Sequence, residues 1–486
     1  MEEKKRWLDK VYQYIDDHFR KDHLPRILEL VRQPSVCGTG EGIEECSNMV
    51  MKMLEDLGCT DVHKEYYVYS PVVTGYLAAD VPDAPKIIMY GMYDVQPPEP
   101  IEEWTVPPYG GTIKDYPPYG ECVVSRGITN SKGVLVTFLN VVAAIREVLG
   151  YNPVNIKFVV EGEEEMGSES LREFTKKHAE ELAQYDVTFL NGARQDEKNT
   201  PFCIFGNKGI LYMELEVTGG KFGGPQEVDV HSMNAAWLNS PVWYLVHALA
   251  SMRDKDDNIV IEGFYDDLPE LTESDKALTQ RMIDTFDEKM YLDERLHAQK
   301  FMKDMTGAEA IYNLMWNPTL NIDGIWAGYT GPATKTVLPY KANAKLDVRL
   351  VPPMKAETVL AAIEKHLKKY GFDEVKIRVQ QGTPGSRVDT DCLGARAAIL
   401  AMEESGYENT YAWPVFPGSG PAWMFTRPPI NAPYVSYGMG LGGRIHAPDE
   451  WMTVQGLHDN EKSCAAFLYY MTVLTEQERT RKQEKE

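Results

Sequence analysis

Residues 154–168, VNIKFVVEGEEEMGS, join an apolar run to a loop that carries four glutamates. The run at 154–160 is rich in β-branched residues, with Pro153 before it and Gly162 and Gly167 after it, which predicts a buried strand that ends in a loop. Open α/β sheets place their ligand sites at the C-terminal ends of such strands. We therefore predict that this loop holds functional carboxylates; a solvated acidic turn is the common alternative.

Similar strand-to-loop transitions occur elsewhere in the chain. Asp94 follows a strand-like run at 86–90, residues 126–133 precede an apolar helix at 134–149, and His446 lies near the end. Alternating strand and helix patterns indicate a sheet covered by helices. The sequence thus predicts an α/β fold with a mixed, mainly parallel sheet; further strands are expected at 66–69 and 186–190, helices at 8–19, 43–57 and 169–183, and a long loop at 97–120.

The chain has 486 residues, which is more than one hydrophobic core usually supports. A half-buried strand at 210–217 begins a region with strands at 344–351 and 374–380 and a helix at 356–370. We interpret this region as a smaller α+β domain inserted into the first one. The predicted boundaries are 1–212 and 383–486 for the catalytic domain and 213–382 for the inserted lid and dimerisation domain.

Composition restricts the partners and the location of the protein. The chain is 43% hydrophobic and 25% charged, with a formal net charge of −23, which argues against nucleic acids or anionic membranes as partners. Residues 1–6 are charged where a signal peptide would be apolar, and no apolar run approaches the length of a membrane span. We expect a cytoplasmic protein that binds small molecules or another subunit.

The cysteines do not suggest a metal site. There are seven, without a CxxC pair, so neither a disulfide framework nor a thiolate zinc site is indicated.

Taken together, the motifs resemble those of the M20 family of metallopeptidases, most closely its carnosinase and cytosolic non-specific dipeptidase branch. The resemblance covers nearly the whole chain and depends on the ordered set of motifs rather than on any single one. These motifs are Asp94-Val95-Gln96-Pro97, Arg126-Gly127 with Lys132-Gly133, Glu161-Gly162 with Glu164-Glu165, Asp229 with His231-Ser232, Lys335-Thr336-Val337, Arg349-Leu350-Val351-Pro352, Gly418-Ser419-Gly420-Pro421 and His446.

The resemblance implies a catalytic domain interrupted by a lid that forms a homodimer, and a site for two divalent metals. It assigns Glu164 as the general base and Glu165 as a metal ligand. Carboxylate and imidazole ligands suit zinc or manganese, and two cations would activate a water for attack on an amide.

The sequence departs from the family pattern at three of the five positions that bind metal. Met92 stands where the family has histidine, Asn130 replaces the bridging aspartate, and Gly192 aligns with a third carboxylate. Only Glu165 and His446 remain.

Electrostatics makes this loss important. Two dications about 3.5 Å apart repel by about 19 kcal/mol at an effective dielectric constant of about 20. Neither a thioether nor an amide replaces a carboxylate for zinc or manganese. We expect no dinuclear centre and no required cofactor; one zinc or manganese ion held by Glu165, His446 and the Asn130 carbonyl is the alternative.

Without metal, Glu164 and Glu165 would form an uncompensated acidic pair. Like charges raise the pKa of one carboxyl until a proton or a cation binds. The pair could then act as general acid and base, with Glu164 as the principal group, or accept a cationic group of the substrate.

The positions expected to bind substrate are better preserved. His231, which the resemblance implies reaches the partner subunit's site, is present, as are Thr336, Arg349, Gly418 and Ser419. Together with His446 they suit an amino acid or dipeptide, whose carboxylate an arginine can pair in bidentate fashion.

Two neighbours of Met92 are also of interest. The resemblance implies that an aspartate at the position of Asp94 orients the metal centre beside the histidine that Met92 replaces, so Asp94 is expected to have a different partner here. Tyr93 lies between the two. A simpler interpretation is that Asp94 only holds its loop through backbone hydrogen bonds.

Three functional hypotheses follow. The first is an M20-fold enzyme that acts on a small amino-acid-like or dipeptide substrate without the usual metal pair, by amide hydrolysis or transfer, isomerisation or elimination. The second is a metal-dependent dipeptidase with a reduced or mononuclear site, and the third is an inactive ligand-binding pseudopeptidase.

Overall fold

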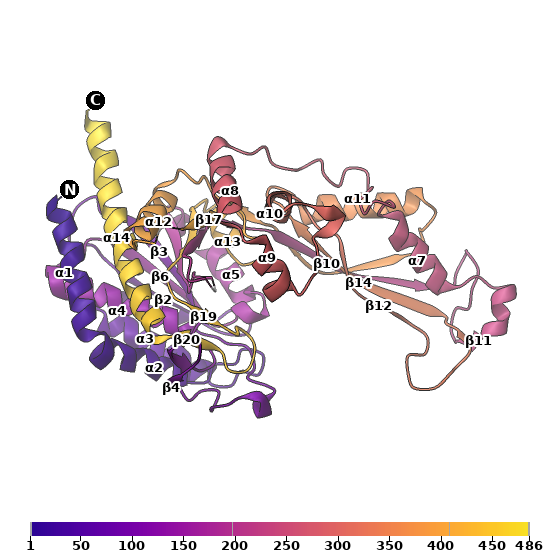
Figure 1. Ribbon diagram of the computed structural model, residues 1–486, viewed down its shortest axis with the longest axis horizontal. Helices are drawn as coiled ribbons and strands as arrows, with labels where there is room; N and C mark the ends of the chain where they lie inside the picture. Colours follow the sequence, from indigo (N-terminus) through magenta and orange to yellow (C-terminus); the bar gives the residue numbers. More distant parts are fainter. Residues whose placement is uncertain (1, 197, 408, 485–486) are drawn as a thin grey trace. The chain divides into compact units, whose positions relative to one another are not determined.

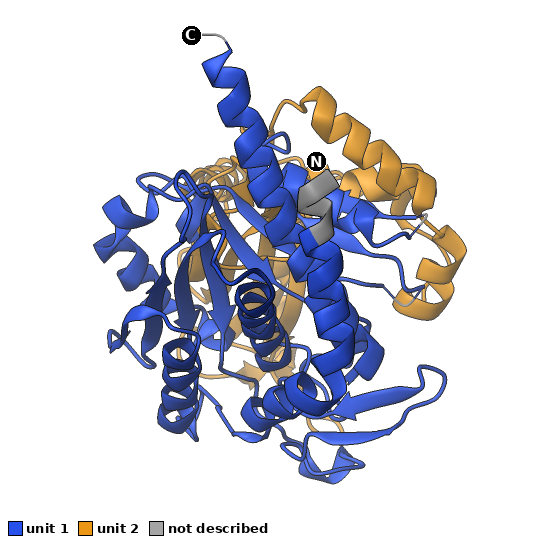
Figure 2. Cartoon of the chain, turned by 90° about the vertical axis from the view of Figure 1, so that its left-hand side faces the viewer, with its two compact units in different colours: residues 1–205, 388–414, 424–486 blue, residues 206–387, 415–423 orange. Residues whose placement is uncertain are grey.

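The computed structural model describes residues 2–196, 198–407 and 409–484. The chain divides into two compact units (Figure 2), of which unit 1 comprises residues 1–205, 388–414 and 424–486, and unit 2 comprises residues 206–387 and 415–423. All of 383–486 was expected in the catalytic domain, but the segment 415–423 belongs to unit 2. The backbone N–H of Lys208 donates to the Phe416 carbonyl, and Ser419 accepts a hydrogen bond from Arg349.

Unit 1 is built on an eight-stranded mixed sheet with the order β1-β2-β6-β3-β7-β18-β8-β17. The four strands β6, β3, β7 and β18 are parallel to one another, whereas the β1/β2, β2/β6 and β18/β8 pairs are antiparallel. This confirms the predicted mixed α/β sheet. The strands span Thr60–Glu65 (β1), Val72–Leu77 (β2), Lys86–Met92 (β3), Asn155–Glu161 (β6), Val187–Asn191 (β7), Phe202–Ile204 (β8), Tyr411–Trp413 (β17) and Tyr434–Tyr437 (β18).

The apolar run at 154–160 forms the inner strand β6. Its residues from Ile156 to Glu161 are all buried, as expected for a strand with neighbours on both sides and helices over the sheet. The strand predicted at 66–69 is wrong, because β1 ends at Glu65. The backbone N–H groups of Tyr69 and Ser70 instead donate to the carboxylate of Glu163.

Helices cover the sheet of unit 1 (Figure 1). Helix α4 packs on β3 and β7, α3 on β1 and β2, and α12 on β7, β8 and β18, while the long α14 packs against α1, α4 and α12. The helices span Glu2–His18 (α1), Leu24–Arg32 (α2), Ile43–Asp56 (α3), Lys132–Leu149 (α4), Glu169–Lys177 (α5), Ala179–Leu182 (α6), Leu393–Glu404 (α12), Trp423–Thr426 (α13) and Val454–Gln483 (α14).

A second, antiparallel sheet in unit 1 has the order β19-β20-β5-β4. The expected loop at 97–120 is therefore interrupted by a strand, since it contains β4. Stacking of Tyr116 and Tyr119 on Trp451 covers this sheet. The strands span Thr112–Asp115 (β4), Glu121–Val124 (β5), Gly442–Gly443 (β19) and Trp451–Thr453 (β20).

Unit 2 contains an antiparallel sheet with the order β12-β14-β10-β15, on which α7 and α11 pack. Burial alternates along much of β10, as the sequence predicted for a half-buried strand. The elements span Gly206–Asn207 (β9), Gly209–Thr218 (β10), Val230–His231 (β11), Pro241–Ser251 (α7), Glu273–Thr285 (α8), Glu288–Met290 (α9), Gly307–Trp316 (α10), Asn321–Ala327 (β12), Val337–Leu338 (β13), Lys341–Leu350 (β14), Ala356–Lys369 (α11), Lys376–Thr383 (β15) and Ser386–Arg387 (β16).

Among the helices that the structure describes, none combines the length and apolar character needed to cross a bilayer.

Candidate active site

The four glutamates at 161, 163, 164 and 165, the first of which ends β6, separate into two structural and two site residues. Glu161 accepts hydrogen bonds from the Tyr90 hydroxyl at 2.5 Å and the Ser168 hydroxyl at 3.0 Å. Glu163 is fully buried and accepts bonds from the backbone of Ser70 and from Ser170. These two carboxyls hold the loop, which leaves Glu164 and Glu165 to form the site.

Glu165 is the centre of a polar cluster in unit 1. Its Oε1 accepts a hydrogen bond from the Asn130 amide at 2.7 Å and lies 3.0 Å from His446 Nε2. Its Oε2 accepts a bond from Gln96 Nε2 at 2.9 Å. The Asn130 amide nitrogen is also 3.1 Å from His446 Nε2. An amide group thus occupies the position predicted to bridge two metals, and it neutralises no charge there.

Asp94 supports this cluster through the backbone of Glu165. Its Oδ2 accepts the backbone N–H of Glu165 at 3.0 Å, and its Oδ1 is buried with no hydrogen-bond partner within the described ranges. Burial, together with the nearby Glu165 charge, raises the pKa of Asp94 to about 7, against the lowering effect of its hydrogen bonds. An unpaired buried oxygen is best accommodated on a neutral carboxyl, so Asp94 takes up a proton near neutral pH.

Glu164 is protonated even more readily than Asp94. Burial raises the pKa of Glu164 to about 8, the charges of Glu165 and Asp94 act in the same direction, and His446 opposes them. The hydrogen bond to Glu165 raises the pKa of His446. The site therefore contains a neutral carboxyl beside an imidazole–carboxylate pair, an arrangement suited to proton transfer at neutral pH.

Met92 and Tyr93, at the end of β3, do not touch the two site glutamates through any hydrogen bond that the structure describes. Met92 is buried opposite Glu161 in the ladder between β3 and β6. The Tyr93 hydroxyl donates to the Pro71 carbonyl at 2.7 Å. A Cβ on Gly162 would lie 2.2 Å from the Tyr93 ring. Tyr93 therefore packs against the loop and leaves no room for a side chain at position 162.

The third altered position is filled by an arginine that the sequence analysis did not identify. A Cβ on Gly192 would lie 2.8 Å from Nε of Arg194, whose guanidinium donates to the Ser436 hydroxyl at 2.9 and 3.0 Å. Burial raises the pKa of the Tyr434 phenol to about 12, while the charge of Arg194 lowers it and that of Glu164 raises it. A cation therefore stands beside the position where a metal-binding carboxylate was expected.

Glu450 is a second residue that the sequence analysis missed. It is fully buried, pairs with Arg126 at 3.0 Å, and accepts backbone N–H groups from Gly127, Thr129 and Asn130, each at 3.0 Å. It thereby fixes the loop that presents Asn130 to Glu165. The only signal for it in the sequence is the acidic pair that follows His446 and precedes an apolar run.

The predicted substrate-binding residues of unit 2 form two separate pairs. His231 Nε2 lies 3.5 Å from the Thr336 hydroxyl, and Arg349 Nη1 donates to the Ser419 hydroxyl at 2.9 Å. The first pair lies before the start of β14 and the second near its end. Since β14 has 10 residues, the two ends of the strand are roughly 30 Å apart. Gly418 precedes Ser419, and a Cβ there would meet the Phe416 ring.

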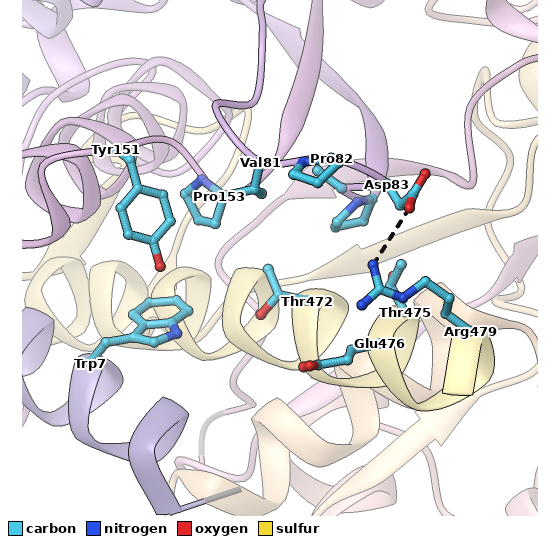
Figure 3. A pocket seen from close by; sticks show the side chains of 12 residues that line it. Trp7, Val81, Pro82, Asp83, Tyr151, Pro153, Thr472, Thr475, Glu476 and Arg479 are labelled. Carbon is cyan, nitrogen blue, oxygen red and sulfur yellow. Dashed lines mark hydrogen bonds and ion pairs between the residues drawn. The ribbon is translucent and has the colours of Figure 1, made fainter. Parts of the chain in front are cut away.

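Two cavities are lined by other residues than the site carboxylates. One in unit 1, of about 290 Å³, is bounded by Trp7, Tyr151, Thr472 and Arg479, with Arg479 paired to Asp83 (Figure 3). The other, in unit 2, includes Arg349. Neither contains Glu164 or Glu165. Among the residues that the structure describes, no three histidine, cysteine, aspartate or glutamate side chains are arranged to hold a metal ion.

Comparison with known proteins gives a consistent result. Residues 88–470 match the sequence profile of peptidase family M20/M25/M40. The chain is 30% identical over 342 residues to the Beta-Ala-His dipeptidase of Mus musculus, an alignment that covers 68% of this chain and 66% of the relative. The chain thus spans just under two thirds of that enzyme's length.

A second relative is similar over more of its length, and the fold is shared with a solved structure. The Cys-Gly metallodipeptidase DUG1 of Saccharomyces cerevisiae is 28% identical over 408 residues, covering 82% of each chain. The M20 family metallo-carboxypeptidase Sso-CP2 from Sulfolobus solfataricus superposes with a TM-score of 0.82 at 30% identity, covering 93% of this chain and all of the other. Because the profile match extends over most of the sequence, this chain belongs to peptidase family M20/M25/M40.

Proposed function

We propose that this protein is a hydrolase of dipeptide-sized substrates. Its family membership and its similarity to a Beta-Ala-His dipeptidase and a Cys-Gly metallodipeptidase support this class of reaction. The observation that carries the proposal is the placement of Glu164 and Glu165 together at the end of β6, beside His446, in a chain of this family. The relatives give no support to the isomerisation or elimination considered from the sequence.

The donor set does not fit two metal ions. Of the five positions that the family resemblance assigns to metal binding, Met92, Asn130 and Gly192 supply no carboxylate or imidazole, and Arg194 adds a positive charge beside Gly192. As placed, Asn130 directs its NH₂ group, not its carbonyl, towards Glu165 and His446. A pair of dications there would lack the anionic ligands that offset their repulsion.

The relatives nevertheless favour a metal-dependent reaction over the metal-free one expected from the sequence, because one of them is named a metallodipeptidase. Glu165 and His446 are the two residues that would hold a single zinc or manganese ion, and the Asn130 carbonyl would join them only if its amide group turned over. Such an ion would polarise the amide carbonyl and acidify a water. Two such donors are one fewer than catalytic zinc usually has, so binding should be weak.

Without an ion, the Glu164 carboxyl is neutral at rest, so it can donate a proton to the nitrogen that leaves as the amide bond breaks, while the Glu165 carboxylate takes the proton of the attacking water. A bound dication would lower the pKa of Glu164 and favour its ionised form, which would act as the base toward water. Glu165 and His446 provide the adjoining charge, and Asn130 and Gln96 orient Glu165.

A homodimer and a cytoplasmic location stay predictions. The distance between the two residue pairs along β14 supports the first, because His231 lies too far from Arg349 of its own chain to share a substrate carboxylate with it. We therefore propose that His231 serves the site of a partner subunit.

The test is an assay of dipeptide hydrolysis, including β-Ala-His and Cys-Gly, with purified protein, after EDTA treatment, and after zinc or manganese is returned. Loss of hydrolysis after EDTA treatment and its recovery when metal is returned would establish the single-ion route. Activity that resists EDTA but disappears in Glu164→Gln would establish the metal-free route. Dipeptide binding without turnover by either the wild type or Glu164→Gln would contradict the proposal and indicate a pseudopeptidase. Two bound metals per chain would refute the donor-set argument.

A further inference from the structure

Arg194 in unit 1 is a partly exposed cation whose hydrogen bonds go to a neutral group. Its Nε and Nη2 both donate to the Ser436 hydroxyl, at 3.0 and 2.9 Å. Within the ranges that the structure describes, no carboxylate forms an ion pair with it. A guanidinium has five N–H donors, so the two bonds to Ser436 leave the others for a ligand.

The surroundings make this positive charge costly. Partial burial lowers the pKa of the Arg194 guanidinium, because the charged form loses contact with water. Charges in such places are normally paired. An anion beside Arg194 would therefore be favoured, and a guanidinium suits a carboxylate best, through two parallel hydrogen bonds.

The position of the guanidinium is fixed before any ligand binds. The Arg194 N–H donates to the Gly438 carbonyl at 2.7 Å, and the Arg194 carbonyl accepts the Phe202 N–H at 2.9 Å. A Cβ on Gly192 would lie 2.8 Å from the guanidinium Nε, so glycine at 192 leaves the space that the guanidinium uses. A preorganised cation loses little conformational freedom on binding.

Arg194 lies on the same edge of the sheet as Glu164. Each follows a strand end by three residues, because β7 ends at Asn191 and β6 at Glu161. Only β3 separates these two strands, and all three run parallel. With strands about 4.8 Å apart, the two strand ends are roughly 10 Å apart. Besides burial, the charges of Arg194 and Glu164 shift the pKa of Tyr434, downward and upward respectively, so Tyr434 lies near both.

This separation indicates which carboxylate of a substrate Arg194 would meet. The terminal carboxylate of a dipeptide lies only one residue, about 3.6 Å, beyond the amide that is cut. An acidic side chain extends further from that amide. With the amide at Glu164, an acidic side chain is the better match to a cation two strands away.

We propose that Arg194 determines substrate specificity by binding an acidic side chain of the dipeptide, so that the preferred substrates carry a carboxylate besides the terminal one. The inference rests on the proposed dipeptide hydrolysis and adds a substrate class to it. Every residue that carries it belongs to unit 1.

Binding of Glu-Ala and Gln-Ala to the purified full-length protein at neutral pH, measured by calorimetry, tests the proposal. These dipeptides differ only in the side-chain carboxylate, and charged hydrogen bonds should make Glu-Ala bind roughly 10- to 100-fold more tightly. Arg194→Met should remove this preference by weakening Glu-Ala alone, and Arg194→Lys should retain part of it. The matched control is Arg479→Met, in the exposed pair with Asp83, which should keep the full preference.

A second variant leaves the arginine in place. Gly192→Ala forces the guanidinium to shift and should reduce the preference for Glu-Ala, which keeps the test decisive if Arg194→Met does not fold.

Four results would overturn the proposal: equal wild-type affinities for the two dipeptides, no binding of either, a preference that survives Arg194→Met, or equal weakening of both dipeptides by that variant. The last result would mean that Arg194 binds the terminal carboxylate or only holds its loop. Selective binding without turnover would retain the Arg194 site and refute the hydrolase. Turnover of both dipeptides without selectivity would refute the Arg194 site and retain the hydrolase.

Discussion

A Cβ on Gly192 would lie 2.8 Å from Nε of Arg194, so a side chain at 192 would require the Arg194 guanidinium to shift. The guanidinium is held by the Ser436 hydroxyl. Its positive charge therefore lies beside the position where the family resemblance predicts a carboxylate.

This relationship predicts how the metal site can be rebuilt. Met92→His, Asn130→Asp and Gly192→Asp together should not restore two bound metals while Arg194 remains, since the new carboxylate at 192 would pair with the guanidinium. Adding Arg194→Ala should release that carboxylate and raise the metal content towards two ions per chain. Elemental analysis after dialysis measures the difference. Two ions in the triple variant would contradict the prediction.

A second prediction concerns pH and Glu164. Because the pKa of Glu164 is about 8 in the folded protein, against about 4.3 in an unfolded chain, the folded state binds more protons between these values. The stability contributed by this group is complete below the unfolded pKa and is lost as the pH rises through the folded pKa. In EDTA, Glu164→Gln should thus gain thermal stability over the wild type by roughly 1–3 °C between pH 5 and about 8.

The control for this experiment is the exposed Glu102, whose replacement by glutamine should give a difference that does not change with pH. If Glu164 carries out proton transfer, Glu164→Gln should also lower kcat by roughly 100-fold or more. Identical melting curves at every pH would show that Glu164 ionises normally.

A third prediction concerns the buried pair of Arg126 and Glu450. Glu450→Gln removes a charge that Arg126 and three backbone N–H groups share, and leaves the guanidinium buried and unpaired. We expect a loss of about 3–5 kcal/mol in the free energy of unfolding of unit 1. The matched control is Glu121→Gln, in the exposed pair with Arg20, which should cost less than about 1 kcal/mol. Urea denaturation measures both, and equal costs would contradict the prediction.

The sequence predicted the strand β6 and its loop because burial on both faces leaves a continuous apolar run. It could not divide the four glutamates between structure and site. That division depends on Ser70, Tyr90 and Ser170, which donate to two of them from distant segments.

Long-range contacts also explain the residues that were missed. Glu450 and Arg194 belong to no recognisable motif, and their roles arise only when separate segments meet. The expected strand at 66–69 failed for the same reason, because Glu163 takes the backbone N–H groups of Tyr69 and Ser70. By contrast, the interpretation of Met92, Asn130 and Gly192 as altered metal positions needs only the sequence, and it stays a prediction.

A fourth prediction concerns Asn130, whose amide donates to Glu165 Oε1 at 2.7 Å. Asn130→Asp would place two carboxylates in contact and complete a set of three metal donors with His446. Without metal this pair must share a proton, so the variant should be less stable than the wild type above neutral pH. Zinc or manganese should reverse the loss and bind roughly 10-fold or more tightly than to the wild type. Calorimetric titration gives the affinities, with the exposed Asn431→Asp as the control. An unchanged metal affinity in Asn130→Asp would mean that Glu165 and His446 are not oriented to share an ion, and the single-ion route would then have to be abandoned.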